Sequence, residues 1–333
     1  MDAPVNLALV GAGRMGSFHG KALREDSAVT ISVVVDADPA AARSLAGAID
    51  AEPSISLDDV IAMPGIDGWL IATSTPSHPE IVAMAIEGGV HALCEKPLSL
   101  DVELGAELGQ RAAEQGLVLQ VGFWRRFAPG WVAARRMIDT GAIGRPLLLR
   151  FAQWDADPPP PAFCDPAVSG GLAIDCGVHE YDLAEWLTGS QVTRVTARNL
   201  PVVSQAVGEA GDVDNLVAIL DLANGAVATV DLSRNFRYAD DVRTEILGSD
   251  GALFVDMLPE GSTRLATAGG LSIVEGSKAP DPMTSGVVAQ ARAFATAIRS
   301  EAGGFPGATA SNRAVSIGRA VQAAALSGQS ETV

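Results

Sequence analysis

Three side chains far apart in the sequence could together remove a proton from a substrate hydroxyl: Lys96, Asp175 and His179. Lys96 lies in the tripeptide Glu95-Lys96-Pro97 directly after a short apolar run, where its ammonium group could stabilise an alkoxide or transfer a proton. Asp175 and His179 are four residues apart, a spacing at which helical residues share a face. An isolated pair of this kind more often consists of a capping aspartate and a structural histidine. The presence of Lys96 favours the catalytic interpretation.

A glycine-rich turn near the N-terminus has the spacing of a phosphate-binding turn. The apolar run at 5–10 is expected to be a buried strand, and Gly11, Gly13 and Gly16 follow it in GxGxxG spacing. The first glycine allows the tight turn, the second lets the backbone approach a pyrophosphate, and the third allows close packing of helix and sheet. The sequence therefore predicts a dinucleotide site at this turn.

An acidic residue defines which dinucleotide is preferred. After a helix expected over 17–24, a second strand over 31–35 ends at Asp36. Its carboxylate can accept hydrogen bonds from ribose hydroxyls and would repel a 2′-phosphate. We therefore predict NAD as the cofactor in preference to NADP.

Strands and helices continue to alternate to about residue 122, which predicts a parallel, doubly wound sheet, the Rossmann fold. Further strands are expected at 67–72, 91–94 and 117–121, and helices at 40–48, 79–88 and 102–115. Ligands bind beyond the carboxyl ends of such strands. The predicted cofactor-binding residues, taken from the turns at that edge, are Gly11, Ala12, Gly13, Arg14, Met15, Gly16, Asp36, Thr73, Ser74, Thr75, His78, Glu95 and Lys96.

The pattern changes to strand–turn–strand after residue 122. Strands are expected at 147–154, 192–197, 216–222, 227–232, 243–247 and 252–255, with hairpin turns at Asn224-Gly225 and Asp250-Gly251. We therefore predict a Rossmann domain over 1–122 and an α+β domain with an open, mostly antiparallel sheet over 123–333. Apolar stripes in 285–300 and 314–325 indicate core-packing helices, and the last helix could pack back on the first domain.

These motifs together resemble the Gfo/Idh/MocA oxidoreductases, and the resemblance covers essentially the whole chain. It rests on the glycine turn, Asp36, the loop 75–78, Glu95-Lys96-Pro97 and the stretch 170–182 that contains Asp175 and His179. The segment 122–182 is most similar to the inositol 2-dehydrogenase group. The resemblance implies Lys96, Asp175 and His179 as catalytic residues, and homodimers or homotetramers formed through the C-terminal sheet. Its implied polyol contacts are Arg126, Asp182 and Tyr238, to which Asp155 is added as a further hydrogen-bonding group.

The predicted activity is an NAD-dependent dehydrogenase that oxidises a secondary hydroxyl of a polyol or cyclic sugar, with myo-inositol as the leading substrate. Alternatives are a dehydrogenase or reductase of another sugar or sugar acid, and a redox-assisted glycosidase or epimerase with tightly bound NAD. A third alternative, a non-catalytic NAD-binding regulator, does not require Lys96, Asp175 and His179 together.

Composition excludes several other classes. With 40 acidic and 23 basic residues the net charge is −17, which disfavours nucleic acid and anionic membrane surfaces as partners. Three cysteines are too few for a disulfide framework, and we expect a soluble, cytoplasmic protein. A metal site built from Asp175, Cys176 and His179 would lack the usual ligand spacing, so no metal is expected.

Overall fold

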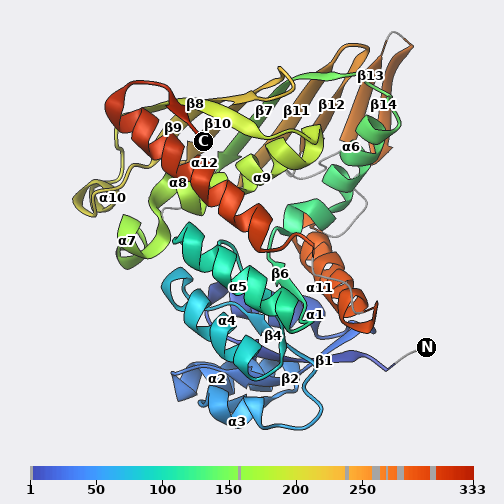
Figure 1. The fold of residues 1–333 in the computed structure, drawn as a ribbon, viewed down its shortest axis with the longest axis vertical. Coiled ribbons are helices and arrows are strands. Elements are labelled where there is room, and N and C mark those ends of the chain that lie inside the picture. Colours follow the sequence, from blue (N-terminus) through green and yellow to red (C-terminus); the bar gives the residue numbers. More distant parts are fainter. Residues whose placement is uncertain are drawn as a thin grey trace. The chain divides into compact units, whose positions relative to one another are not determined.

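The structure is a computed structural model that describes residues 3–156, 159–236, 240–256, 263–267, 269–275, 281–300 and 305–333. The chain forms two compact units (Figure 1). One contains residues 1–124 and 286–312, and the other contains residues 125–285 and 313–333. The chain thus returns to the N-terminal unit near its end.

The N-terminal unit is built on a six-stranded parallel sheet in the order β3-β2-β1-β4-β5-β6. Its strands are β1 (Val5–Val10), β2 (Val29–Val35), β3 (Glu52–Ser54), β4 (Gly68–Ile71), β5 (His91–Cys94) and β6 (Leu119–Val121). Its helices are α1 (Arg14–Leu23), α2 (Pro39–Ile49), α3 (Leu57–Ile61), α4 (His78–Glu87), α5 (Val102–Glu114) and most of α11 (Pro282–Ser300), with a short 3₁₀ turn η1 (Thr75–Ser77).

The strands of this sheet are continuous apolar runs because helices bury both of its faces. Leu7 and Leu9 of β1 are completely buried, and Phe294 from α11 packs into the same core. The strand order reverses direction between β1 and β4, so the turns after these two strands lie at the topological switch point. The predicted cofactor residues follow β1, β2, β4 and β5 at this edge.

The C-terminal unit contains a nine-stranded sheet in the order β14-β13-β12-β11-β7-β10-β9-β8-β15. The pair β7–β10 is parallel and the other pairs are antiparallel. The strands are β7 (Pro146–Trp154), β8 (Val192–Asn199), β9 (Asn215–Leu222), β10 (Val227–Ser233), β11 (Asp241–Gly248), β12 (Gly251–Asp256), β13 (Thr263–Thr267), β14 (Gly270–Glu275) and β15 (Glu331–Thr332). The helical elements are η2 (Trp124–Phe127), α6 (Pro129–Asp139), η3 (Pro161–Phe163), α7 (Pro166–Ser169), α8 (Gly171–Asp175), α9 (Gly177–Thr188), α10 (Gln205–Glu209) and α12 (Ala308–Ser327).

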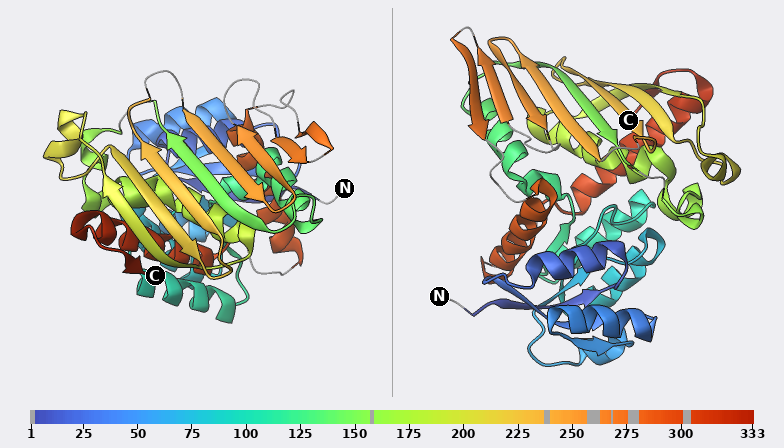
Figure 2. Two further views of the ribbon diagram at one scale, coloured as in Figure 1. Left: turned by 90° about the horizontal axis from the view of Figure 1, so that it is seen from above. Right: turned by 180° about the vertical axis from the view of Figure 1, so that it is seen from behind.

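Among the described residues, helices cover only one face of this sheet. Strand β9 alternates, with Leu216, Ala218 and Leu220 buried on the helical face, while Val217 and Ile219 on the opposite face are 38% and 48% exposed. In the part of the chain that the structure describes, Figure 2 shows the strands with no helix in front of them. We call this uncovered side the open sheet face.

The predicted fold class is confirmed, with a parallel Rossmann sheet followed by a mostly antiparallel one. The elements not predicted from the sequence include β3, α3, α6, α7, α8, α10, β13, β14 and β15. Most of these elements are too short to show a period, and α6 begins at Pro129 immediately after a 3₁₀ turn. Among the described residues, no helix has the length and apolar character needed to span a membrane.

Candidate functional site

The glycine turn after β1 leaves room for a pyrophosphate. Gly11 has φ +102°, and a Cβ there would lie 2.7 Å from the Ala72 carbonyl oxygen. A Cβ on Gly16 would overlap the Gly11 carbonyl oxygen, whereas one on Gly13 would have no neighbour within 4 Å. No side chain caps the N-terminus of α1, so its first N–H groups can serve an anion. This turn fits NAD, and Arg14 lies exposed beside it.

Asp36 lies at the end of β2 and reaches the same turn. One carboxylate oxygen accepts a hydrogen bond from the Ala12 amide at 2.7 Å, and the other accepts from the Asp38 amide at 2.8 Å. Each oxygen of a carboxylate has a second lone pair. The carboxylate therefore fixes the glycine turn and can still accept hydrogen bonds from ribose hydroxyls.

The loop after β4 is held by its own side chains. The Ser77 hydroxyl donates to the Thr73 hydroxyl at 2.9 Å, and Ser74 is exposed while Thr75 is buried. His78 is buried, with Nδ1 2.8 Å from the Pro97 carbonyl oxygen and Nε2 3.2 Å from the Thr73 carbonyl oxygen. Burial lowers the pKa of His78. Both ring nitrogens thus face the chain's own backbone, and His78 joins the β4 loop to the turn that carries Lys96.

Lys96 leaves β5 at the same sheet edge and is half-buried. The neighbouring Glu95 points inward, where its Oε1 lies 2.6 Å from Nε2 of His19 on α1. Its Oε2 accepts a hydrogen bond from the Lys96 amide at 3.3 Å. Burial raises the pKa of Glu95, but the hydrogen bond to His19 and the charges of His19, Lys96 and His78 together outweigh it, and the net shift of the pKa is downward. The ionised Glu95 carboxylate therefore holds the Lys96 backbone in place from inside the protein.

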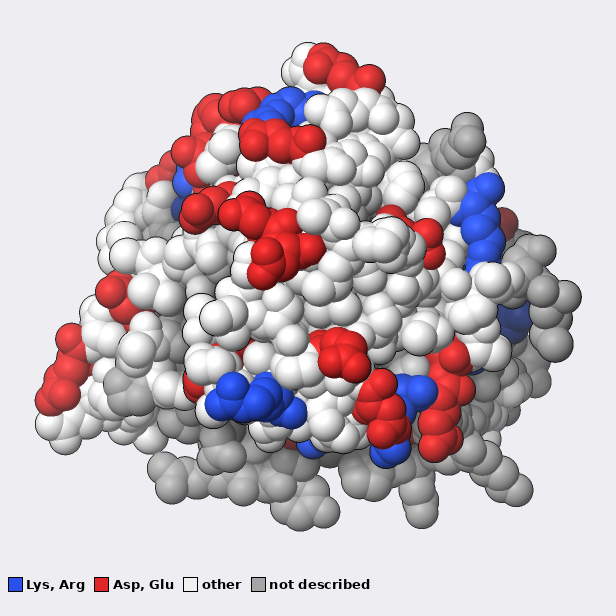
Figure 3. Space-filling view, turned by 90° about the horizontal axis from the view of Figure 1, so that it is seen from below, with Lys and Arg blue, Asp and Glu red and all other residues white. Residues whose placement is uncertain are grey.

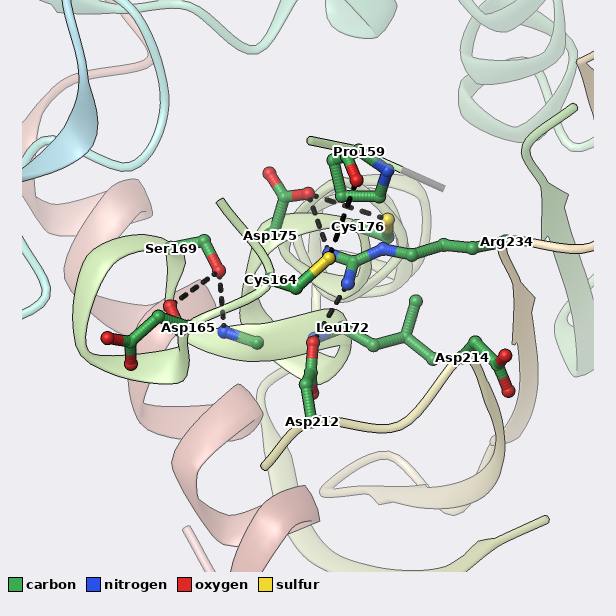
Figure 4. Close-up of polar contacts among 12 residues, drawn as sticks. Pro159, Cys164, Asp165, Ser169, Leu172, Asp175, Cys176, Asp212, Asp214 and Arg234 are labelled. Carbon is green, nitrogen blue, oxygen red and sulfur yellow. Dashed lines mark hydrogen bonds and ion pairs between the residues drawn. The ribbon is translucent and has the colours of Figure 1, made fainter. Parts of the chain in front are cut away.

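In the C-terminal unit, Asp175 ends α8 and His179 lies in the first turn of α9. Arg234 lies 3.1 Å from Oδ2 of Asp175 (Figure 4). The Cys176 thiol donates to Asp155 at 3.4 Å. Burial, together with Asp240 and Asp175, raises the pKa of Asp155. Two predicted site residues, Asp155 and Asp175, thus lie close together, on either side of the Cys176 thiol.

Two further predicted residues pair with each other. Nε of Arg126 donates to Asp182 at 2.7 Å and a second guanidinium nitrogen donates at 2.5 Å, so the ion pair is bidentate. Asp182 is 4% exposed, and burial raises its pKa to about 6 against the opposing effect of Arg126. Arg126 also lies 5.7 Å from the ring of Trp186. This pairing occupies donors and acceptors that the sequence analysis assigned to a substrate.

Some outcomes could not be reached from the sequence. Tyr238 lies outside the described residues. Neither the His19–Glu95 contact, nor the Arg234–Asp212 ion pair, nor the buried Arg125–Glu180 ion pair was predicted from the sequence. The hairpin of β9 and β10 offered a signal for the second of these, because Asp212 precedes β9 and Arg234 follows β10.

Comparison with known proteins agrees with this geometry. The oxidoreductase family with an NAD-binding Rossmann fold matches residues 5–123, and the GFO/IDH/MocA C-terminal domain matches residues 131–254. A scyllo-inositol 2-dehydrogenase (NAD(+)) of Bacillus subtilis (strain 168) is 34% identical over 82% of this chain and 80% of that protein. An inositol 2-dehydrogenase of Rhizobium meliloti (strain 1021) is 35% identical over 80% of both chains. The structure of a myo-inositol dehydrogenase from Corynebacterium glutamicum ATCC 13032 has a TM-score of 0.85 and 28% identity, with 99% of each chain covered.

The chain therefore belongs to the GFO/IDH/MocA family of oxidoreductases. Within this family it is an NAD-dependent oxidoreductase that acts on CH–OH groups. The predictions of family, cofactor and reaction class are confirmed.

Proposed function

We propose that the protein oxidises a secondary hydroxyl of an inositol to the corresponding ketone, with myo-inositol as the leading substrate. The observation that carries the substrate class is the similarity to two inositol 2-dehydrogenases, each at least 34% identical over about four fifths of both chains. The C-terminal unit supports a polyhydroxy substrate, because Asp155, Asp175 and His179 place acceptors on neighbouring elements.

Each polar residue has a distinct role in this reaction. Bound NAD⁺ supplies the hydride acceptor. His179 accepts the hydroxyl proton, Asp175 orients and supports its imidazole, and Lys96 stabilises the developing alkoxide by donating a hydrogen bond. Glu95 and His78 support this chemistry indirectly by holding the backbone on either side of Lys96.

Further predicted residues would bind the substrate's other hydroxyls. Asp155 accepts hydrogen bonds at the end of β7, and the Arg126–Asp182 pair could share one donor and one acceptor with a diol. We retain Tyr238 as a proposed contact on the resemblance alone. The glycine turn, Asp36 and the loop 73–75 would hold NAD, in preference to NADP.

We further propose a homodimer or homotetramer in the cytoplasm, formed through the open sheet face. Val217, Ile219 and Leu247 expose apolar surface there, which water disfavours. All three cysteines are buried and none forms a disulfide, as suits a reducing compartment. The net charge of −17 disfavours nucleic acid and anionic membranes as partners, and on the face shown in Figure 3 the described acidic side chains are spread among smaller basic groups.

The test is formation of NADH when the purified protein and NAD⁺ meet a panel of inositols, aldoses and sugar acids. A Lys96→Met variant serves as the blank. A Lys96-dependent rate on an inositol supports the proposal, whereas a Lys96-dependent rate confined to aldoses or sugar acids would replace the substrate class. No rate on any compound in either direction would overturn the proposed function.

A further inference from the structure

A buried arginine lies beside the proposed acid–base pair. Arg234 directly follows β10 and is 1% exposed. Its guanidinium reaches Asp212 at 2.8 Å and Asp175 at 3.1 Å through different nitrogens. Burying an unpaired charge is costly, so an arginine in this position requires both carboxylates. Figure 4 shows the guanidinium pointing between the two acids, with Cys164 and Cys176 beside it.

The register of a hairpin brings these groups together. Strands β9 and β10 are antiparallel with Asn215 opposite Ser233, so residue 214 lies opposite residue 234. The Arg234 amide donates to the Asp214 carbonyl oxygen at 2.9 Å. The completely buried Asp214 carboxylate accepts from the amides of Val203 and Ser204. The backbone of Arg234 is therefore fixed by the sheet rather than by a mobile loop.

Asp212 extends the same network to helix α8. Its two carboxylate oxygens lie 3.2 and 3.0 Å from the Leu172 amide, in the first turn of the helix. Gly171 has φ +72°, and a Cβ there would lie 2.7 Å from Oδ1 of Asp212, so only glycine allows this approach. Asp212 therefore holds the N-terminal end of α8.

Asp175 is the last residue of this five-residue helix. A helix so short has little stability of its own, because the conformational entropy lost in forming the first turn exceeds the free energy gained from its hydrogen bonds. Arg234 holds Asp175 directly and, through Asp212, holds the opposite end of the helix. Arg234 and Asp212 therefore both contribute to the position of Asp175.

Charge adds a second effect to this positioning. Among the described residues, the charged and titratable groups near Asp175 include Arg234, Asp212, Asp155, Asp240, Cys164 and Cys176. His179 follows four residues later, in the first turn of α9. Like charges at close range favour protonation of one of the acids. A positive charge held among them favours the ionised form of Asp175, which is the form that can support a protonated imidazole.

We propose that Arg234 is a positioning residue for this reaction, which fixes Asp175 and sets the pH at which the Asp175–His179 pair takes up its proton. The inference rests on the proposed function, because it assigns the proton transfer to that pair. It adds an assignment for Arg234 and Asp212, which do not themselves touch the reacting atoms.

The first test measures the protonation of His179 by NMR, in the absence of substrate. The chain has four histidines, so the His179 signal in a proton-detected NMR titration is identified by its loss in His179→Gln. Arg234→Met removes a positive charge, so the His179 signal should titrate at higher pH than in the wild type. Asp212→Asn keeps an oxygen for the Leu172 amide but removes a negative charge, so the signal should titrate at lower pH.

Opposite shifts in the two variants are the expected result, and Arg234→Lys should return the titration toward that of the wild type because it retains the charge. A merely structural role would not produce shifts of opposite sign. If Arg234→Met does not fold, Arg234→Lys and Asp212→Asn still decide the question. Unchanged titration in the soluble variants, or shifts in one direction only, would overturn the proposal.

The second test measures turnover of myo-inositol and scyllo-inositol with NAD⁺. Arg234→Met should lower kcat about 10- to 100-fold, since a displacement of about 1 Å in a catalytic group can cost that much. The dissociation constant of NAD⁺ should be unchanged, and the acid limb of the kcat/KM profile should move to higher pH. The matched control is Arg313→Met, which removes a similar arginine paired with Glu185 at 2.6 Å and should keep wild-type kcat.

The two tests separate the inference from the proposed function. Wild-type turnover with normal kcat in Arg234→Met would overturn the role of Arg234 and leave the proposed function intact. Absence of wild-type turnover on every inositol would overturn the substrate proposal, while opposite His179 shifts would still support the coupling of Arg234 to the pair.

Discussion

Individual polar residues of this protein are held by partners remote in the sequence. Glu95 and His19 are separated by 76 positions, and Arg234 and Asp175 by 59. In each case a buried charge has an oppositely charged or hydrogen-bonding partner, as desolvation requires. The residues nearest the proposed chemistry are therefore held by a second set of buried groups.

Cofactor preference depends on one carboxylate. Asp36→Ala should weaken NAD⁺ binding about 10- to 100-fold, because a hydrogen bond to a charged group contributes about 1.5–3 kcal/mol. Removing the negative charge should weaken NADP⁺ much less, so the ratio of the two affinities falls. Binding of each cofactor by fluorescence titration checks this, and an unchanged ratio would contradict the assignment of Asp36.

Asp182 should give stability a measurable pH dependence. Its folded-state pKa of about 6 exceeds the unfolded value of about 3.9, so the folded state binds the proton more tightly. This contribution is fully present below the unfolded value and is lost as pH rises through about 6. Between pH 8 and pH 5 the wild type should therefore gain about 1 kcal/mol of unfolding free energy relative to Asp182→Asn. Urea denaturation at both pH values measures the difference, and identical pH dependence in the two proteins would refute the prediction.

At the scale of elements, turns at strand ends set the position of Lys96. Strand β6 lies beside β5, and Gly122 follows it next to Glu95. A Cβ on Gly122 would lie 3.1 Å from both the Cα and the Oε2 of Glu95. The turn that carries Lys96 is thus packed against backbone on one side and held by His78 on the other.

Gly122→Ala should therefore displace Glu95 and with it the backbone of Lys96. We expect kcat to fall about 10-fold and stability to fall by about 1–3 kcal/mol, because a tightly packed site has no room for the methyl group. Gly47→Ala on α2 is the control, since its Cβ would meet no atom within 4 Å and alanine favours helices. That control should retain activity and gain about 0.5–1 kcal/mol, as measured by urea denaturation. Equal kcat in Gly122→Ala and the wild type would argue against this packing role.

For the molecule as a whole, the open sheet face is the main exposed apolar feature: no helix of the described part of the chain covers it. Its outward residues include Val217 and Ile219 on β9 and Leu247, 50% exposed, on β11. The other side is packed against helices such as α9, which contacts both β7 and β10. An uncovered apolar surface on a sheet favours association with a second copy of the chain.

The double variant Val217→Glu/Ile219→Glu should dissociate this assembly, because burying two carboxylates without partners is unfavourable. Light scattering coupled to size-exclusion chromatography should show an oligomer for the wild type and a mass near one chain for the variant. Leu326→Glu on α12, where the leucine is 82% exposed, should retain the wild-type mass. A monomeric wild type, or an unchanged mass in the double variant, would rule out the open sheet face as the interface.

Fold class, cofactor and reaction class could all be predicted from the amino-acid sequence. These predictions rest on local signals: the glycine turn, the acid at the end of β2 and the short apolar runs. Backbone conformation and strand burial each restrict the residue types within a few positions of the chain. The same locality explains the missed elements: α8 is five residues long and shows no period. The four-residue spacing suggested a shared helical face for Asp175 and His179, but Asp175 ends α8 and His179 lies in α9, which begins at Gly177.

Only the tertiary structure decided which polar groups meet. Arg126 and Asp182, both predicted to contact substrate, form an ion pair with each other. His78, predicted beside the cofactor, has both ring nitrogens against backbone carbonyls, and Arg234 and Asp212 gained a role that their sequence neighbours do not indicate. These pairings depend on strand register and on packing across dozens of residues, and desolvation then selects which buried charges must pair.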